Sequence, residues 1–224
     1  DHDKLKILKK NNIPLFRDLE LYSRITKNKK VIAITGTNGK STTTKLISDM
    51  LKVANLKNFL GGNIGVPLLD FIKEYEDINY HCVELSSFQL ESHILFEPFI
   101  SILLNISRDH LDRYKNFKSY IFQKEKIINL NKEGYNIICI DDPYTLNIYK
   151  KNKKKIIPIS KNYLKNGIYY KNGYIIDNYF LPKKNIFLEK ISSSLFGHFN
   201  LENILAAYVV SQIIKMNKKK FKKV

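Results

Sequence analysis

The most constraining feature of the chain is an apolar run, Val31-Ile32-Ala33-Ile34, that leads into a segment rich in glycine, hydroxyl groups and lysine. That segment reads Gly36-Thr37-Asn38-Gly39-Lys40-Ser41-Thr42. Glycine lets backbone N–H groups turn toward an anion, lysine neutralises phosphate oxygens, and the N-terminus of a following helix adds its dipole. The pattern therefore predicts a buried strand, a phosphate-binding loop and a helix, in that order.

The predicted loop is shorter than the general phosphate-binding loop. The general pattern has a glycine five positions before the glycine of the Gly-Lys pair, whereas here that position is Ile34 and the first glycine is Gly36. The sequence Gly-Thr-Asn-Gly-Lys-Ser is similar to that of the Mur ligase and folylpolyglutamate synthetase superfamily, whose members activate a carboxylate with ATP and join it to an amine. The alternative is a plain strand, turn and helix with an incidental lysine, which the order of strand, glycines, Lys40 and Ser41 disfavours.

Length and charge limit the class of protein. A chain of 224 residues can bury a substantial core and is expected to hold one large domain, or one and a half. A net charge of +17 would ordinarily indicate a nucleic-acid or membrane partner, but the lysines are scattered, and clusters at 27–30, 150–155 and 218–223 lie at element boundaries or chain ends. We expect neither partner, with a basic RNA-associated NTPase as the alternative.

The two cysteines and the termini indicate a compartment. Cys82 and Cys139 each lie in an apolar, strand-like run, so we expect core residues and no disulfide framework. Residues 1–12 are charged, and the longest apolar run, at 99–104, is too short to span a bilayer. These features predict a reducing, cytoplasmic location.

Strand-like and helical segments alternate along most of the chain. Strands are expected at 31–34, 80–84, 100–105 and 135–140, helices at 41–54, 68–75, 117–130 and 201–216, and short helices at 4–10, 19–25 and after Ser86. Gly61-Gly62 reads as a turn, and turn signals in 155–191 predict a small antiparallel appendage. The fold class is therefore α/β: a mostly parallel sheet flanked by helices, P-loop-like, with that appendage.

Four further polar motifs lie where a bound ligand would need partners, at the carboxyl ends of predicted strands, which meet at one edge of a parallel sheet. Asn63 lies among the glycines of Gly61-Gly62-Asn63-Ile64-Gly65, which suits contact with a polar ligand or forms an ordinary glycine turn. Glu84 ends an apolar strand, where a buried carboxylate is costly without a cation. It is a candidate Mg²⁺ ligand, and the alternative is a solvated glutamate at a strand end.

Three further features carry more than one interpretation. Asp109, His110 and Asp112 fall in one turn, where a second hard metal ion could bind, although a single histidine is more often structural. Lys124 lies on a helix among other lysines, and residue chemistry alone does not select it. The tract Gly197-His198-Phe199-Asn200-Leu201-Glu202-Asn203 offers two amides at a helix start, which either read the edge of a purine or cap the helix.

The order of these motifs makes the resemblance more specific. The segments beginning at Gly36, Gly61, Glu84 and Asp109 resemble the branch of the Mur ligases that adds D-glutamate to UDP-N-acetylmuramoyl-L-alanine, above all in Ser-Ser-Phe-Gln-Leu-Glu. The resemblance implies an ATP-dependent amide ligase of peptidoglycan precursor synthesis that works through an acyl phosphate. A ligase adding another amino acid, a folylpolyglutamate synthetase and an inactive nucleotide-binding module remain alternatives.

The resemblance also implies roles for the loop and its surroundings. Lys40 and the backbone amides of residues 38–42 would hold the ATP phosphates, Ser41 and Glu84 would bind one Mg²⁺, and His110 would help to bind a second. ATP and two Mg²⁺ ions are therefore the expected cofactors. Lys124 would be a carbamylated lysine, because a carbamate turns a cation into a carboxylate-like metal ligand.

Two assignments in this set depend on spacing within the family pattern. Lys124 is selected by its four-residue distance from Tyr120, and Lys126 is a close competitor that the spacing disfavours. Phe199 stands where the family usually has a histidine, which here lies one position earlier at His198. The residues expected at the UDP-muramoyl substrate are Asn63, Ser86 and Gln89, and those expected at the adenine are Asn200 and Asn203.

The resemblance divides the chain in two. Residues 1–29 are expected to be the tail of an N-terminal domain with its linker, and residues 30–224 the central ATP-binding domain. Family members also have an N-terminal domain for the uridine nucleotide and a C-terminal domain that closes with the amino acid, and we expect both to be absent here. The expected partners are small molecules, and the expected state is a monomeric fragment without turnover of its own.

Overall fold

The computed structural model describes residues 3–14, 16–74, 77–91, 96–109, 113–152, 156–180, 184–187, 200–217 and 221. The helices are α1 (Asp3–Lys10), α2 (Asp18–Ile25), α3 (Lys40–Val53), α4 (Phe71–Glu74), α5 (Phe117–Leu130), α6 (Pro143–Asn152) and α7 (Leu201–Ile213), with 3₁₀ turns η1 (Leu68–Asp70) and η2 (Gln89–Glu91). The strands are β1 (Lys30–Thr35), β2 (Asn58–Gly62), β3 (Tyr80–Glu84), β4 (Ile100–Leu103), β5 (Tyr135–Cys139), β6 (Ile156–Ser160), β7 (Ile168–Lys171), β8 (Tyr174–Asp177) and β9 (Lys184–Phe187).

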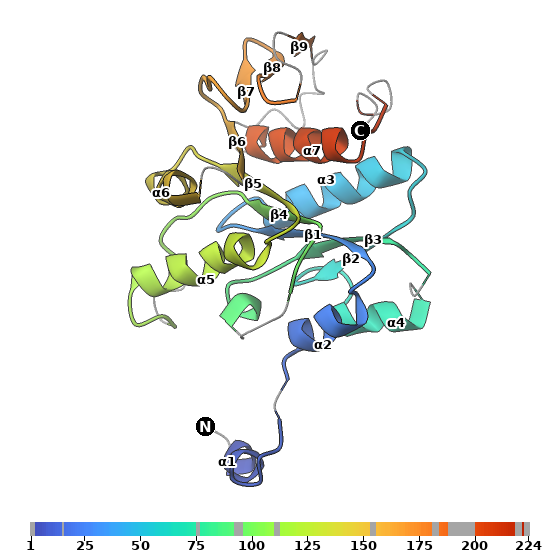
Figure 1. Ribbon diagram of the computed structural model, residues 1–224, viewed down its shortest axis with the longest axis vertical. Helices are drawn as coiled ribbons and strands as arrows, with labels where there is room; N and C mark the ends of the chain where they lie inside the picture. The colour runs from blue at the N-terminus through green and yellow to red at the C-terminus, as the bar shows by residue number, and fades with distance from the viewer. Residues whose placement is uncertain are drawn as a thin grey trace.

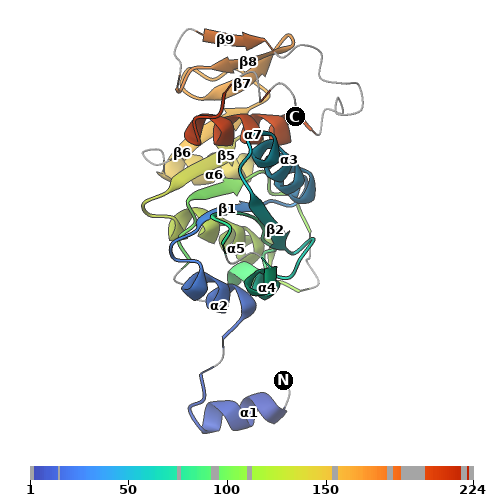
Figure 2. The same ribbon diagram turned by 90° about the vertical axis from the view of Figure 1, so that its right-hand side faces the viewer.

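All the strands in the described ranges belong to one sheet. Its order is β2-β3-β1-β4-β5-β6-β7-β8-β9. Neighbours from β2 through β7 pair in parallel, and β7, β8 and β9 pair antiparallel. Parallel neighbours need crossover connections, and helices α3, α5 and α6 lie within such crossovers against the sheet (Figures 1 and 2). The result is a helix–sheet–helix sandwich.

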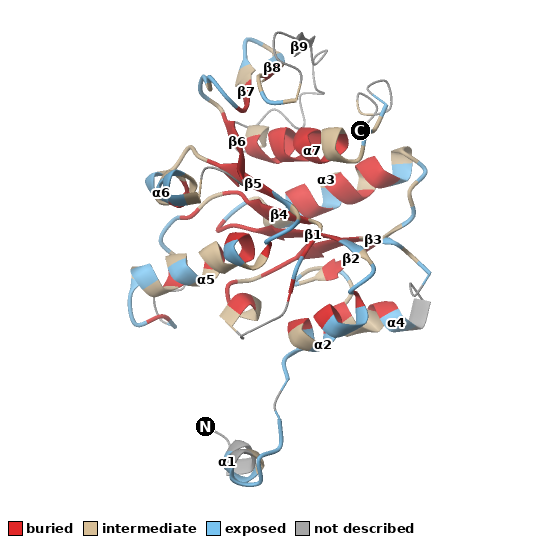
Figure 3. Cartoon of the chain, in the orientation of Figure 1, coloured by how far each residue is buried: buried red, intermediate tan, exposed pale blue. Residues whose placement is uncertain are grey.

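Two apolar clusters hold this sandwich together, one on each face of the sheet (Figure 3). In β1, Ile32 and Ile34 join the cluster that includes α3 and α7, while Val31 and Ala33 join the cluster that includes α2 and α5. A fully buried aliphatic side chain contributes about 1.5–3 kcal/mol. A strand buried on both faces therefore reads as an unbroken apolar run, as the sequence does before the predicted loop.

The N-terminal helices differ in their relation to the sandwich. Helix α2 packs on it through Leu19 and Tyr22, both fully buried, whereas α1 lies apart from it at the end of an extended segment (Figures 1 and 2). None of the helices in the described part of the chain combines the length and the apolar character needed to cross a bilayer.

The structure confirms the parallel α/β fold, the helix at 117–130 and the strand at 80–84. The expected turn at Gly61-Gly62 is wrong, because both glycines end the short strand β2. A Cβ at Gly61 would lie 2.3 Å from the ring of Phe59, which explains the need for glycine within a strand. Helix α6 has no counterpart among the expected helices.

The expected small antiparallel part is present, but among the described residues it begins after β6 and is continuous with the main sheet. Strand β6, which lies in the stretch expected to be the appendage, pairs in parallel with β5. Only β7, β8 and β9 are antiparallel among the described strands, and they extend the same sheet through the parallel contact between β6 and β7. Residues 155, 181–183 and 188–191 of the expected appendage lie outside the described residues.

A buried histidine joins α2 to the sheet. The Nε2 atom of His81 lies 3.0 Å from the carbonyl oxygen of Ile78 and must donate to it, so Nδ1 accepts from the Tyr22 hydroxyl at 2.8 Å. Burial lowers the pKa of His81 to about 4, against the raising effect of the hydrogen bond to Ile78. The neutral imidazole is thus part of the packing between α2 and β3.

We predict that this histidine makes the domain sensitive to acid. The pKa of His81 is lower in the folded state than its ordinary value of 6.5, so its contribution to stability is complete above about pH 6.5 and is lost as the pH falls toward 4. Across this range, the urea midpoint of the wild type should fall more steeply than that of His81→Gln. Tyr22→Phe should lower the midpoint but keep the steep slope, because burial remains. Equal slopes in wild type and His81→Gln would contradict the assignment.

Candidate active site

Three neighbouring strands bring the predicted polar residues together at the carboxyl edge of the sheet. Strand β1 lies between β3 and β4, with Ile34 opposite Glu84 and Thr35 opposite Leu103. The loop after β1 therefore emerges between the end of β3, which carries Glu84, and the segment after β4, which carries Asn105. This is the edge at which open parallel sheets bind ligands.

The loop from Gly36 to Gly39 is held by hydrogen bonds to the segment after β4 and to α5. The Thr37 N–H donates to the Asn105 carbonyl at 2.8 Å, and the Thr37 hydroxyl lies 3.0 Å from that of Tyr120. Gly39 then adopts φ +81° at the start of α3. The first-turn amides of this helix have no partners within it, and Lys40 lies beside them with Nζ 2.8 Å from the Thr37 carbonyl. Amides, helix dipole and ammonium group together favour an anion.

Glu84 provides a buried carboxylate next to this loop. It is 1% exposed, and its two oxygens accept from the Ser41 hydroxyl at 2.8 Å and from the Asn63 amide at 2.9 Å. None of the ion pairs found among the described residues involves Glu84. A buried carboxylate beside a hydroxyl is a donor set that suits Mg²⁺, a hard cation that prefers oxygen ligands.

Lys124 lies on the other side of the loop, buried to 2% exposure. Its Nζ atom donates to the Gly36 carbonyl at 2.7 Å. Burial and the nearby charge of Lys40 lower the pKa of Lys124 to about 7, although Asp109 and Glu84 act in the opposite direction. The competitor Lys126 instead donates to the carbonyl of Glu91, away from the loop. Of these two lysines, Lys124 is therefore the one that contacts the loop.

The residues expected at the adenine lie at the start of α7. Asn203 is buried, accepts from the Thr43 hydroxyl at 2.9 Å and donates to the Asn200 side chain at 3.2 Å. Asn200 precedes α7, but its side chain makes no capping hydrogen bond. His110, expected at a second metal ion, lies outside the described residues.

The residues expected at the UDP-muramoyl substrate lie near β3 and α2. Asn63 follows β2 and is bound to Glu84, so it belongs to the same group as Ser41. Ser86 and Gln89 follow β3 and bond to each other, with the Ser86 N–H 3.1 Å from Gln89 Oε1. Gln89 also donates to Asp18 at the start of α2, at 3.2 Å. The loop after β3 is thereby hydrogen-bonded to α2, which precedes β1 in the chain.

Asn105 is a residue whose role the sequence did not indicate. Its Oδ1 accepts from the Asn38 N–H at 2.8 Å, and its Nδ2 donates to the Asn38 carbonyl at 3.1 Å. The Asn38 amide, which we expected at the phosphates, is therefore already bonded, and the free donors begin after it. The sequence marks Asn105 only as the end of a strand, and nothing local predicts its partner.

Strand, glycine-bearing loop, lysine and helix together define an α/β domain of the P-loop type. Residues 34–211 match the model of the Mur ligase middle domain, and the chain belongs to that family. Two similar proteins are the UDP-N-acetylmuramoylalanine–D-glutamate ligases of Rickettsia bellii and Rickettsia prowazekii, each 42% identical. These alignments cover 95% and 98% of this chain but 48% and 49% of those proteins. The chain thus spans about half the length of these curated relatives.

Solved structures show the same fold at lower sequence identity. A Neisseria meningitides ligase, UDP-N-acetylmuramate:L-alanyl-gamma-D-glutamyl-meso-diaminopimelate ligase, superposes with a TM-score of 0.72 and 16% identity over 99% of this chain and 73% of that one. The MurF ligase of Thermotoga maritima, solved in complex with ADP, gives a TM-score of 0.65 and 17% identity over 93% of this chain and 52% of that one.

We predict that Gly39 is essential to the shape of the loop. A Cβ at Gly39 would lie 2.6 Å from Asn203 Oδ1, whereas at Gly173, which has a similar φ of +84°, it would meet nothing within 4 Å. Gly173→Ala should cost about 1–2 kcal/mol of backbone strain, and Gly39→Ala roughly 1–3 kcal/mol more from overpacking. Urea denaturation of both variants measures the difference. Equal losses would show that Asn203 does not confine the loop.

Proposed function

We propose that this chain is the central ATP-binding part of an amide ligase that joins D-glutamate to UDP-N-acetylmuramoyl-L-alanine. The observation that carries the proposal is the placement of Lys40, Ser41 and Glu84 around the first turn of α3, with the Ser41 hydroxyl 2.8 Å from the carboxylate. Relatives at about 40% identity that carry this activity in their names support the choice of substrates.

In the proposed reaction, a substrate carboxylate attacks the γ-phosphorus of ATP, forming an acyl phosphate and releasing ADP. The amine of D-glutamate then attacks the acyl carbon, an amide bond forms, and inorganic phosphate leaves. Lys40 and the free amides at the start of α3 would bind the phosphates and offset charge on the transferring group. In this step the chain would position the ATP phosphates and stabilise the charge on the transferring phosphoryl group.

Glu84 and Ser41 would hold Mg²⁺, which supplies charge neutralisation at the phosphates when bound. The exposed side chain of Asn63 donates to Glu84, so it would orient that carboxylate and lie near the muramoyl substrate. Ser86 and Gln89 would form the next part of that surface. Asn200 would contact the adenine, and the buried Asn203 would support it from behind the loop.

Lys124 and His110 would complete a second Mg²⁺ site. Carbamylation joins the neutral amine of Lys124 to CO₂, forming an N–C bond and releasing a proton to solvent. Burial favours this step because it destabilises the ammonium form, and a pKa of about 7 for Lys124 leaves part of the amine neutral near that pH. The resulting carbamate carries a negative charge, which suits a metal ligand better than an ammonium group.

The same proposal covers the setting of the reaction. The uridine nucleotide and the amino acid would be bound by further domains before and after this one, with residues 1–29 leading from the first of them. The complete enzyme would act as a cytoplasmic monomer on small molecules. Closure of a C-terminal domain over ATP would be needed for turnover, so the chain alone would bind nucleotide without catalysing ligation.

We predict that Lys40→Ala weakens the binding of a non-hydrolysable ATP analogue with Mg²⁺. Losing one charge-assisted contact costs about 2–3 kcal/mol, or roughly 30- to 150-fold in affinity. Isothermal titration calorimetry measures this. Lys45→Ala is the matched control, since Lys45 lies on the same helix but pairs with Asp49 at the surface. Wild-type affinity in Lys40→Ala would refute the phosphate site.

We predict that Lys124 takes up CO₂. Protein equilibrated with ¹³C-bicarbonate should show a carbamate signal in ¹³C NMR that disappears in Lys124→Ala and persists in Lys126→Ala. The physical reason is the burial of the Lys124 amine, since Lys126 is more accessible and bonded elsewhere. A carbamate signal that survives in Lys124→Ala would assign the modification to another lysine.

A further inference from the structure

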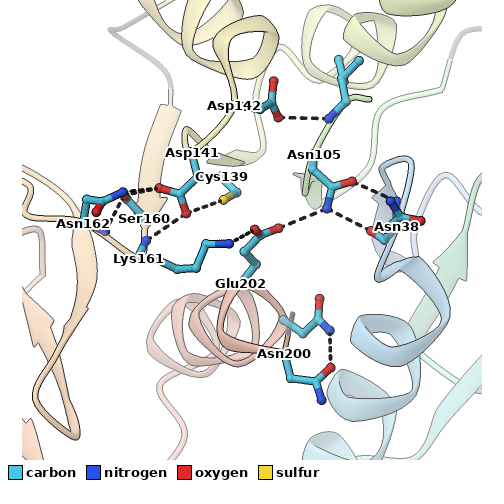
Figure 4. A network of polar contacts seen from close by, with 12 residues as sticks. Asn38, Asn105, Cys139, Asp141, Asp142, Ser160, Lys161, Asn162, Asn200 and Glu202 are labelled. Atoms are coloured by element: carbon cyan, nitrogen blue, oxygen red, sulfur yellow. Dashed lines mark hydrogen bonds and ion pairs between the residues drawn. The ribbon is translucent and has the colours of Figure 1, made fainter. Parts of the chain in front are cut away.

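A chain of polar contacts runs from the phosphate loop to the carboxyl ends of β5 and β6 (Figure 4). Glu202, in the first turn of α7, stands at its centre and is 9% exposed. One carboxylate oxygen accepts from Asn105 Nδ2 at 3.1 Å, and the other accepts from Lys161 Nζ at 2.8 Å. Asn105 in turn binds both backbone groups of Asn38. Four segments far apart in sequence thus meet behind the loop.

Glu202 and the Asn38 peptide require the same orientation of the Asn105 amide. A carboxylate only accepts hydrogen bonds, so the NH₂ group of Asn105 must face Glu202. The second hydrogen of that NH₂ then reaches the Asn38 carbonyl, and Oδ1 meets the Asn38 N–H. A flipped amide would place an oxygen against the carboxylate and reverse both contacts with Asn38. The orientation that fits the loop is therefore also the one that the Glu202 carboxylate requires.

Lys161 anchors the other end of this chain of contacts. Burial acts to lower its pKa, but the hydrogen bond and charge of Glu202 together with the nearby charge of Asp141 raise the pKa overall, so the lysine stays charged. The Lys161 N–H donates to Asp141 at 2.9 Å, and the Ser160 hydroxyl donates to the same carboxylate. Asp141 follows β5, so the end of β6 is fixed to the end of β5.

A metal ion is a poorer explanation of this cluster. Ligand atoms of Cys139, Asp141 and Glu202 lie within 4.8 Å of one another. Burial raises the pKa of the Cys139 thiol, so it remains protonated and donates to Asp141 at 3.4 Å. The ammonium group of Lys161 already supplies a cation at Glu202. The cluster is therefore a complete internal network.

We propose that Glu202 is a positioning residue for the phosphate loop: through Asn105 it fixes the peptide of Asn38, immediately before the amides that receive the anion. This inference rests on the proposed nucleotide binding and adds a residue from α7 to it. The ion pair with Lys161 holds Glu202 in place, so the loop geometry depends on the segment after β6.

The test combines nucleotide titration with NMR of the 224-residue chain. Glu202→Ala should weaken binding of the ATP analogue with Mg²⁺ about tenfold and shift the Asn38 amide resonance, because one charged hydrogen bond is lost. Lys161→Met should have a smaller effect in the same direction. Asp49→Asn, which breaks an exposed ion pair on α3, is the control and should change neither readout.

A double-mutant cycle separates positioning from general destabilisation. Asn105→Asp places two carboxylates together and should weaken binding strongly. In a Glu202→Gln background the same change should cost much less, because the introduced amide can donate to the introduced carboxylate. Additive losses would overturn the proposal. Wild-type affinity and an unshifted Asn38 resonance in Glu202→Ala would also overturn it, provided that Lys40→Ala weakens binding as predicted. If Lys40→Ala also binds normally, the nucleotide site itself is wrong.

Discussion

The structure depends on one constraint: at the carboxyl ends of β2, β3, β1 and β4, the backbone approaches its neighbours too closely for side chains at certain positions. A Cβ at Gly36 would lie 3.0 Å from the Cβ of Leu104, and a Cβ at Gly62 would lie 2.3 Å from the Glu84 carbonyl. This close approach brings a buried carboxylate, a hydroxyl and two lysines to the same end of the sheet. Their charges are tolerable there because each has a hydrogen-bonding partner.

The elements that the sequence predicted well are those that depend on residues close together in the chain. The unbroken apolar run of β1, followed by glycines and Lys40, predicted strand, loop and helix, because these features act within about ten residues of one another. Helix α5 was predicted at its observed bounds, and in the structure the Asn116 side chain caps it by accepting from the Ser119 N–H. The family resemblance, and not periodicity, selected Lys124.

The parts that the sequence did not predict depend on partners distant in the chain. Nothing near Gly61 shows that it lies in a strand, because its pairing with Val83 is 22 residues away. Strand β6 contains Pro158 and was assigned to the appendage. Its parallel pairing with β5 shows that it belongs to the main sheet. Asn105 and Glu202 are 97 residues apart, and only the docking of α7 reveals their contact.

The contact between Thr43 and Asn203 joins residues 160 positions apart, across almost the whole domain. During synthesis, the loop and α3 leave the ribosome long before α7 exists to support them. Contacts of such long range close slowly, because the entropy of ordering the intervening chain must be overcome first. The loop before α3 is therefore among the earliest segments to be made, whereas its support from α7 can form only after residue 203 has been synthesised.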